Sequence, residues 1–309
     1  MDLTPFAADL DDETYLSEIA ALSFEGVKWD REKVGAVRDL FGHWDHNIAL
    51  GHGIYTARSN ECFPAHQEIM EVINHALSGE FAGKRVLDLG CLEGYFAAEC
   101  ALHGADVVGV EGKLINVRKC QFVKAVLGLK SLRIVRDDAL AVTRARYGSF
   151  DVVLALGLLY HLDDPFTFLG QVSELCDGFA VIDTHVALEK LPESIGDGWN
   201  PELSASQDFG YRGKTYTGRL FREFDRDAKQ LAKDLSPTAS LANELSVWLT
   251  EDSLVELLRD VGFDQVEKLV YGRRSGVWWG DLEREARVLL VAAKRRNPFR
   301  SRVFDARPR

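Results

Sequence analysis

The stretch Arg85-Val-Leu-Asp-Leu-Gly-Cys-Leu-Glu-Gly-Tyr-Phe96 decides the fold of this chain. Its first residues are mostly apolar and favour a β-strand, although Asp88 lies among them. Gly90 and Gly94 follow, and the residues from Tyr95 to His103 are typical of a helix. Glycine lets a backbone bend sharply or approach a ligand, because it has no Cβ atom. The order strand, glycine turn, helix therefore predicts a ligand near the helix N-terminus.

A second acidic strand end follows, because Asp106-Val-Val-Gly-Val-Glu111 has the pattern of a short strand that ends in a carboxylate. Its separation from the glycine turn suits a carboxylate that holds ribose hydroxyls in a doubly wound α/β fold. The turn has the spacing D-x-G-x-x-x-G rather than the G-x-G-x-x-G of a dinucleotide clamp, so we expect no cradle for a pyrophosphate. Asp88 can attract an ammonium or sulfonium group. These details favour S-adenosylmethionine over a nicotinamide or flavin dinucleotide.

Three further predicted strands also end in polar residues. Ser131–Val135 leads into Arg136-Asp-Asp-Ala139, and Phe150–Gly157 is an almost continuous apolar run, typical of a parallel strand buried on both faces. Phe179–His185 is the fifth strand. Ligands of open α/β sheets collect at the carboxyl ends of the strands. The side chains that we expect to face one crevice are those of Asp88, Glu111, Asp138, Tyr160, His161, Asp183 and His185.

The predicted fold class is α/β, with a Rossmann-like, mostly parallel sheet of seven strands. After a helix from Glu251 to Val261, capped by Thr250, the stretches Gln265–Tyr271 and Ala286–Ala293 predict an antiparallel pair at one edge, which makes the last strand antiparallel. The predicted parts are an N-terminal helical cap (1–80), a cofactor-binding core (81–187), an inserted substrate lid after strand five (188–247), the C-terminal part of the core (248–295) and a basic tail (296–309).

The cap and the insertion are the predicted sources of substrate-binding residues. Trp44 lies in an aromatic, glycine-rich stretch and could either line a pocket or pack the cap on the core. The segment Phe209–Phe221 alternates enough to predict a hairpin. The insertion could be a lid over the acceptor end of the crevice or a surface excursion with solvated charges, and we favour the lid. The lid residues expected to contact a substrate are Tyr211, Arg212, Lys214, Tyr216 and Arg219.

Composition limits the classes of function. The formal net charge of −11 argues against a general nucleic-acid binder. The five cysteines are scattered without a C-x-x-C pair, so we expect reduced thiols and neither a zinc site nor a disulfide framework. His43, His46 and His52 are expected to make hydrogen bonds rather than to bind a metal. No signal peptide or membrane-spanning run is expected, which indicates a cytoplasmic protein.

The glycine stretch resembles the first motif of the class I S-adenosylmethionine-dependent methyltransferases, which commonly reads D-L-G-C-G-x-G. The chain keeps Asp88, Gly90, Cys91 and Gly94 but has Leu92 where the second glycine usually falls. The resemblance implies that Asp138, which precedes Ala139, binds the adenine amino group; Asp137 is the nearby alternative, or simply a helix N-cap. The residues expected to bind the cofactor are Asp88, Gly90, Cys91, Gly94, Tyr95, Glu111, Gly112, Asp137, Asp138, Ala139 and Gly157.

A looser resemblance covers about residues 40 to 190. The pattern from Trp44 to Thr56, the run Gly157-Leu-Leu-Tyr-His161 with Pro165, and Asp183-Thr184 are similar to the branch that contains the tRNA wobble-uridine methyl- and carboxymethyltransferases. This branch is also similar to enzymes that act on small molecules or sugars. The resemblance therefore implies either kind of acceptor, but the acidic balance of the chain disfavours tRNA.

Methyl transfer needs an acceptor atom held in line with the sulfonium methyl group. For a hydroxyl acceptor a base is useful, and histidine is the usual choice. His161 and His185 are the candidates, and Asp183 could orient a histidine or bind an amine. We therefore expect a methyltransferase that acts on a hydroxyl or amine of a small molecule or glycan. The alternatives are a tRNA wobble-base modifier and a catalytically inactive protein of the same fold that serves as a binding partner.

Overall fold

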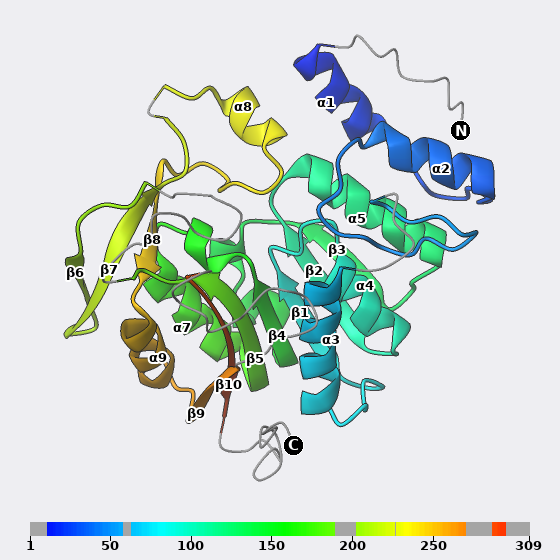
Figure 1. Ribbon diagram of the computed structural model, residues 1–309. Coiled ribbons are helices and arrows are strands. Elements are labelled where there is room, and N and C mark those ends of the chain that lie inside the picture. Colours follow the sequence, from blue (N-terminus) through cyan, green and yellow to red (C-terminus); the bar gives the residue numbers. More distant parts are fainter. Residues whose placement is uncertain (1–10, 58–62, 189–201, 226, 270–285, 295–309) are drawn as a thin grey trace.

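The computed structural model describes residues 11–57, 63–188, 202–225, 227–269 and 286–294 of the chain. Within them, a seven-stranded sheet has the order β3-β2-β1-β4-β5-β10-β9 (Figure 1). Its strands are β1 (Arg85–Leu89), β2 (Asp106–Glu111), β3 (Leu132–Arg136), β4 (Phe150–Leu156), β5 (Cys176–His185), β9 (Gln265–Leu269) and β10 (Arg287–Ala293).

The strand directions confirm the predicted sheet. Strands β1 to β5 run parallel, and β10 runs antiparallel to both of its neighbours, β5 and β9. The order reverses between β1 and β4, which lie side by side although two other strands separate them in the sequence. A crevice forms at such a reversal, outside the carboxyl ends of the strands. The fold therefore places the ends of β1, β2, β4 and β5 around one site.

Helices cover both faces of the sheet (Figure 1). On one face lie α3 (Pro64–Ala76), α4 (Tyr95–Leu102) and α5 (Leu114–Leu127), and on the other lie α7 (Pro165–Leu175) and α9 (Glu251–Asp260). Neighbouring residues of β1 serve different faces: Val86 belongs to the first apolar cluster and Leu87 to the second. This alternation follows from the two-residue period of a strand. Burial on both faces explains why the strands are nearly continuous apolar runs.

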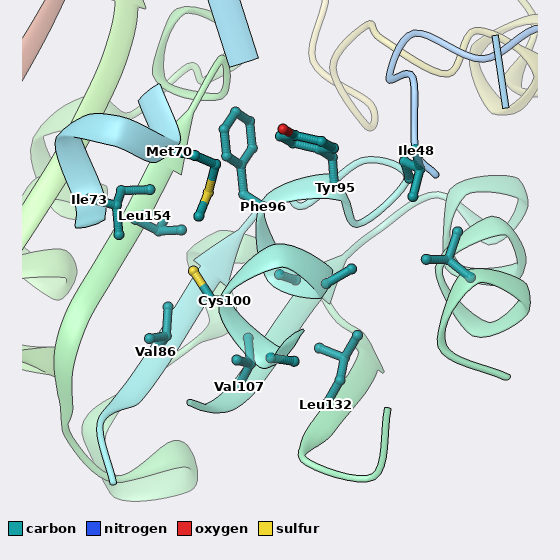
Figure 2. Packing of buried hydrophobic residues seen from close by; sticks show 14 of the residues in the cluster. Ile48, Met70, Ile73, Val86, Tyr95, Phe96, Cys100, Val107, Leu132 and Leu154 are labelled. Carbon is teal, nitrogen blue, oxygen red and sulfur yellow. The ribbon is translucent and has the colours of Figure 1, made fainter. Parts of the chain in front are cut away.

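Figure 2 shows how the first face is packed. Met70 and Ile73 of α3 and Phe96 and Cys100 of α4 lie over the sheet, where they meet Val86 of β1 (Figure 2). All five side chains are at least nine-tenths buried. Because α4 starts directly after the glycine turn, this packing fixes the direction in which the turn leaves the sheet.

The N-terminal region shares this core. Helices α1 (Asp12–Ala21) and α2 (Arg31–Leu40) begin at side-chain caps, Asp11 and Asp30, whose carboxylates accept backbone N–H groups. Behind them, the rings of Phe24, Trp29 and Trp44 surround Phe122 of α5 at centroid distances of 5.5 to 6.4 Å. The apolar contacts of this region therefore attach it to α5.

The insertion contains a second sheet that includes the predicted hairpin. Strands β6 (Gln207–Tyr211) and β7 (Lys214–Arg222) are joined by Arg212 and Gly213, both with positive φ, as a two-residue hairpin loop requires. A third strand, β8 (Leu245–Leu249), pairs antiparallel with β7, which the sequence did not predict. Between β7 and β8 the chain forms the short helix α8 (Gln230–Leu235) and then a segment, residues 237–243, that we call the strap.

No helix within the described ranges combines the length and the apolar character that crossing a bilayer requires.

Candidate functional site

A cavity of about 610 Å³ lies at the carboxyl ends of β1, β2, β4 and β5, where the fold places its crevice. Its volume is in the range of pockets that hold a cofactor-sized ligand. Residues from distant parts of the sequence line the cavity, from the loop after α2 to the start of β10. The predicted site residues on its wall are Asp88, Gly90, Cys91, Glu111, Gly112, Asp137, Asp138, Ala139, Gly157, Tyr160, His161 and Asp183.

Asp88 lies at the floor of the cavity and is 2 % exposed. Burial raises the pKa of its carboxyl group to about 7, although the backbone N–H of Ala97 opposes the shift. Its Oδ2 atom has no hydrogen-bond partner within the described part of the chain. A buried oxygen without a partner costs free energy, and a positively charged or N–H group of a ligand would satisfy it. Gly90 has a φ of 65°, and a Cβ there would lie 2.9 Å from the Leu158 side chain, so only glycine fits beside Asp88.

Glu111 ends β2 and faces the same cavity. Its two oxygens accept the backbone N–H groups of Leu92, at 3.0 Å, and of Lys113, at 2.8 Å. Burial raises its pKa to about 7. The bond from Leu92 explains the departure from the glycine pattern: Leu92 has a φ of 49°, a conformation that leucine rarely adopts, and Glu111 holds it there. Each carboxylate oxygen keeps a lone pair for a ribose hydroxyl.

The third strand end supplies the two neighbouring acids. Asp138 accepts the N–H of Leu140 at 2.9 Å and caps the short helical turn that Ala139 opens. Asp137 accepts the hydroxyl of Tyr147 and forms an ion pair with Arg146 at 2.8 Å; the Tyr147 hydrogen bond is the main reason that its pKa is lowered. Asp137 is thus held by its own neighbours, whereas Asp138 uses one oxygen as a cap and is exposed toward the cavity.

The strap lines the cavity next to Gly112. It lies within the insertion (188–247) that the sequence predicted as a substrate lid, although none of its residues was among those expected to contact a substrate. Asn116 donates its side-chain N–H to the carbonyl of Pro237 at 2.9 Å, and Lys113 donates to the carbonyl of Lys233 at 2.6 Å. A Cβ atom on Gly112 would lie 2.5 Å from the Leu241 side chain. Helix α5 and the turn before it therefore hold the strap directly over the ribose side of the pocket.

His161 and Glu223 form a hydrogen-bonded pair on the cavity wall. The Nδ1 atom of His161 lies 2.9 Å from one carboxylate oxygen of Glu223. Glu223 is almost fully buried and also accepts the Ser246 hydroxyl at 2.9 Å and the backbone N–H of Ser240, on the strap, at 3.3 Å. A carboxylate accepts only, so Nδ1 carries the proton and the lone pair is on Nε2. The arrangement gives His161 the tautomer of a general base.

Glu223 was missed because nothing in the sequence around it indicates a site. It lies 62 residues after His161 at the end of the hairpin. The pair forms because β8 joins β7 to the main domain, which Val247 fixes by donating its N–H to the carbonyl of Leu162 at 2.9 Å.

Asp183 lies at the end of β5 and forms an ion pair with Arg287, the first residue of β10, with an Nε–Oδ1 distance of 2.8 Å. The Arg287 guanidinium also lies 5.8 Å from the centre of the Tyr160 ring. The expectation for His185 is wrong as regards the cavity. Its ring is stacked on Trp248 at 4.9 Å, behind Tyr160, and it is absent from the described cavity wall. Burial lowers the pKa of His185 to about 3. Because its ring is stacked on Trp248 of β8, His185 packs the second sheet against β5.

The loop after α2 reaches the cavity through Asp45 and His46, and not through the predicted Trp44. Trp44 is buried against Phe41 and Phe122, which corresponds to the packing alternative. Glu93, in the glycine turn, fixes this loop: it accepts the N–H groups of Asp45 at 3.1 Å and of His46 at 2.7 Å.

Lys119 of α5 completes this clamp. Its ammonium group lies 2.8 Å from Glu93, and both side chains are almost completely buried. Lys119 also donates to the carbonyl of His43 and lies over the Trp44 ring, 4.9 Å from its centre. The buried ion pair therefore joins the cap loop and the glycine turn, which both line the cavity, to helix α5.

Two predicted cofactor residues support the wall instead of lining it. A Cβ atom on Gly94 would lie 3.1 Å from the Cys120 sulfur, so Gly94 allows α4 and α5 to approach. Tyr95 is buried, and its ring contacts His46 and His66 at 5.7 and 5.4 Å.

The five predicted lid residues do not reach the cavity wall, so this expectation is corrected. Lys214 and Tyr216 both donate to Asp260 of α9, at 2.6 and 2.7 Å. Tyr211 and Arg212 lie next to Gly170 of α7. Arg219 of β7 donates to the carbonyl of Ser204, which lies just before β6, at 3.0 Å. The hairpin packs on the helical face of the domain, and within the predicted lid (188–247) it is the strap that lines the cavity.

Across the described ranges, no group of three or more His, Cys, Asp or Glu side chains could hold a metal ion. Cys91, Cys100, Cys120 and Cys176 are free and buried. The residues present do fit S-adenosylmethionine: a buried, unpartnered carboxylate oxygen suits its positively charged part, Glu111 suits the ribose, and Asp138 suits the adenine amino group.

Comparisons with known proteins agree with this geometry. Residues 64–268 match the methyltransferase domain family. A tRNA U34 carboxymethyltransferase of Helicobacter hepaticus is 32 % identical over 114 residues, which is 33 % of this chain and 35 % of that protein. A ubiquinone biosynthesis O-methyltransferase of Psychrobacter arcticus is 38 % identical over 181 residues, which is 57 % of this chain and 63 % of that protein. The matched part thus spans less than two thirds of either relative.

Among solved structures, the N-terminal domain of EvdMO1, crystallised in the presence of SAH and D-fucose, superposes with a TM-score of 0.62. It is 24 % identical, and the match covers 86 % of this chain and 98 % of that one, which supports the fold assignment. The family match extends from α3 to β9 and includes every strand end that lines the cavity, apart from β10. The protein therefore belongs to the methyltransferase domain family.

Proposed function

We propose that the protein methylates a hydroxyl group of a small molecule or glycan, with His161 as the general base and Glu223 as the residue that positions it. The observation that carries this proposal is the bond of 2.9 Å between His161 and a buried carboxylate at the cavity wall. A histidine that only shaped the pocket would not need a carboxylate behind it. An amine acceptor, the other expectation from the sequence, has less use for such a base, because a neutral amine attacks without prior loss of a proton.

The residues of the cavity wall have separate roles in the proposed reaction. Asp88, Glu111 and Asp138 would hold the cofactor, which supplies a methyl group on a positively charged sulfur. The acceptor hydroxyl would lie against Nε2 of His161, which takes its proton as the oxygen attacks. The proton then stays on the imidazole, and Glu223 stabilises the imidazolium through Nδ1–H. The strap and the cap loop, which line the cavity, would shield the reacting groups from water.

The names of similar proteins support a hydroxyl acceptor without identifying it. The Psychrobacter arcticus relative is named as an O-methyltransferase, and the EvdMO1 domain was crystallised with a deoxy sugar. A tRNA acceptor is the second candidate, because the Helicobacter hepaticus relative is a tRNA U34 carboxymethyltransferase. The net charge of −11 opposes it, since binding to phosphates relies on basic side chains. Titration with tRNA at two salt concentrations separates the two candidates, because a tRNA enzyme would bind with strong salt dependence.

The test of the base uses His161→Gln, with His103→Gln as a control, because His103 is an exposed residue at the end of α4. Formation of S-adenosylhomocysteine would be measured over a panel of phenols, sugars and amines. We expect kcat of His161→Gln to fall about 10² to 10⁴-fold, the usual contribution of a general base, with little change in the Kd for S-adenosylhomocysteine. An undiminished kcat would exclude His161 as the base. Methyl transfer to any acceptor would exclude the alternative that the protein is a catalytically inactive binding partner.

A further inference from the structure

One part of the cavity wall is rich in polar groups that the cofactor site does not use. It comprises Asp45 of the cap loop, His66 of α3, Tyr160 after β4, Asp183 of β5 and Arg287 of β10, which we call the acceptor wall. Asp45, Asp183 and Arg287 each interact electrostatically with both His66 and Tyr160, which shows that the five residues lie together. His161 lies on the same side, because its ring touches that of Tyr160 at 4.2 Å. A molecule bound at the acceptor wall would therefore meet the proposed base.

Two buried atoms of this wall lack hydrogen-bond partners among the described residues: Oδ2 of Asp45 and Nδ1 of His66. His46, beside them on the cavity wall and 7 % exposed, has a third such atom, its Nδ1. Native structures leave few buried polar atoms unsatisfied, and each one calls for an explanation. Because these atoms are in the wall of a cavity, polar groups of a ligand can satisfy them.

The charges of the wall select the kind of ligand. Asp183 and Arg287 neutralise each other, which leaves the Asp45 carboxylate as the net charge of the acceptor wall within the described residues. Burial lowers the pKa of His66 to about 4, so its imidazole is neutral at physiological pH. A phosphate or carboxylate would be repelled by Asp45. An ammonium group at His161 would be repelled by the positive sulfur of the cofactor. A neutral ligand remains.

We propose that the acceptor wall binds a neutral, polyhydroxylated ring such as a sugar, with one hydroxyl at His161 and neighbouring hydroxyls on Asp45, His66 and the Asp183–Arg287 pair. A hydroxyl both donates and accepts, so adjacent hydroxyls match a carboxylate next to an imidazole and a carboxylate next to a guanidinium. The inference rests on the proposed function, since it names the acceptor class for the same site.

The first experiment measures sugar binding to the full chain saturated with S-adenosylhomocysteine, by saturation-transfer NMR. The probes are D-fucose, D-galactose and D-galacturonate, which share a ring and differ at carbon six. We expect both neutral sugars to bind and D-galacturonate to bind at least about tenfold more weakly, because of Asp45. Stronger binding of D-galacturonate, or no binding of either neutral sugar, would overturn the proposal.

The second experiment asks whether these groups serve the acceptor or the cofactor. His66→Phe keeps the ring contacts with Tyr95 and Phe96 and removes the polar atoms, and Asp45→Asn keeps the shape of the side chain. His103→Phe, on the far end of α4, is the control. We expect the first two variants to lose sugar affinity about tenfold, with an unchanged Kd for S-adenosylhomocysteine by calorimetry. If the Kd for S-adenosylhomocysteine also rises tenfold, the groups bind the cofactor and the inference is wrong. If the unaltered protein fails to bind S-adenosylhomocysteine, the proposed function itself fails.

Discussion

Replacement of Asp88 by asparagine should stabilise the cofactor-free protein at alkaline pH while it weakens cofactor binding. The carboxyl group is 2 % exposed, and burial raises its pKa from 3.8 to about 7. Between these two values the folded protein holds a proton that the unfolded chain has already lost. The folded state therefore binds more protons, and the free energy of unfolding falls as the pH rises through this window.

The size of the effect follows from the shift. At about 1.4 kcal/mol for each pKa unit, ionisation of Asp88 lowers the free energy of unfolding by about 2 to 3 kcal/mol between pH 5 and pH 8. Asparagine cannot ionise, so Asp88→Asn lacks this loss. Its buried amide has a constant cost of about 1 to 3 kcal/mol, which does not depend on pH. The difference between the two proteins should thus move in favour of Asp88→Asn as the pH rises.

Urea denaturation of both proteins at pH 5, 6, 7 and 8 measures this difference directly. Glu111, whose pKa is also raised to about 7, is present in both proteins, so its own contribution largely cancels. Calorimetry with S-adenosylmethionine at pH 8 should show at least about tenfold weaker binding by Asp88→Asn, because the ionised carboxylate attracts the cofactor's positive charge. A stability difference that is independent of pH, or one that grows toward acid pH, would refute the buried, protonated state of Asp88.

Three further outcomes are expected. Gly112→Ala should weaken the binding of S-adenosylhomocysteine in calorimetry, since its Cβ would lie 2.5 Å from Leu241, and adding Leu241→Ala should restore it. Lys119→Met should lower the free energy of unfolding by about 3 to 5 kcal/mol in urea titrations, because it leaves the Glu93 carboxylate buried without its cation, and adding Glu93→Gln should recover part of the loss. Glu223→Gln should lower kcat by about tenfold with an unchanged Kd for S-adenosylhomocysteine, because an amide stabilises the imidazolium less than a carboxylate does; a parallel loss of affinity would indicate collapse of the strap instead.

The sheet and the cofactor side of the site could be predicted because both are local in sequence. An apolar run that ends in Asp88, Glu111 or Asp138 places its polar residue at a strand's carboxyl end, whatever the rest of the chain does. The prediction held although Leu92 replaces the usual second glycine of the motif. The hydrogen bond from the Leu92 N–H to Glu111 supports the positive φ that a glycine would adopt without such a bond.

The acceptor side could not be predicted because it depends on contacts between distant segments. His161 meets Glu223 only after β8 pairs with β7, and no pattern near Glu223 indicates this. The prediction that the hairpin residues contact a substrate failed for a related reason. Lys214 and Tyr216 have the chemistry of substrate contacts, but their partner is Asp260, on a helix that the sequence does not connect with them. His185 has the position of a strand-end residue, yet Trp248 of the second sheet occupies its ring face.

The strap ties two functions to one short piece of backbone. The same seven residues cover the pocket above Gly112 and, through the N–H of Ser240 and the side chain of Asn243, hold Glu223 and the carbonyl of His161. If S-adenosylhomocysteine leaves past the strap, the contacts of the strap with Glu223 and with the carbonyl of His161 would break, and His161 would no longer be positioned as a base. A molecule with the strap displaced would then lack a positioned base. Methyl transfer would occur only with the strap in place, which would limit the reaction of the cofactor's sulfonium group with water.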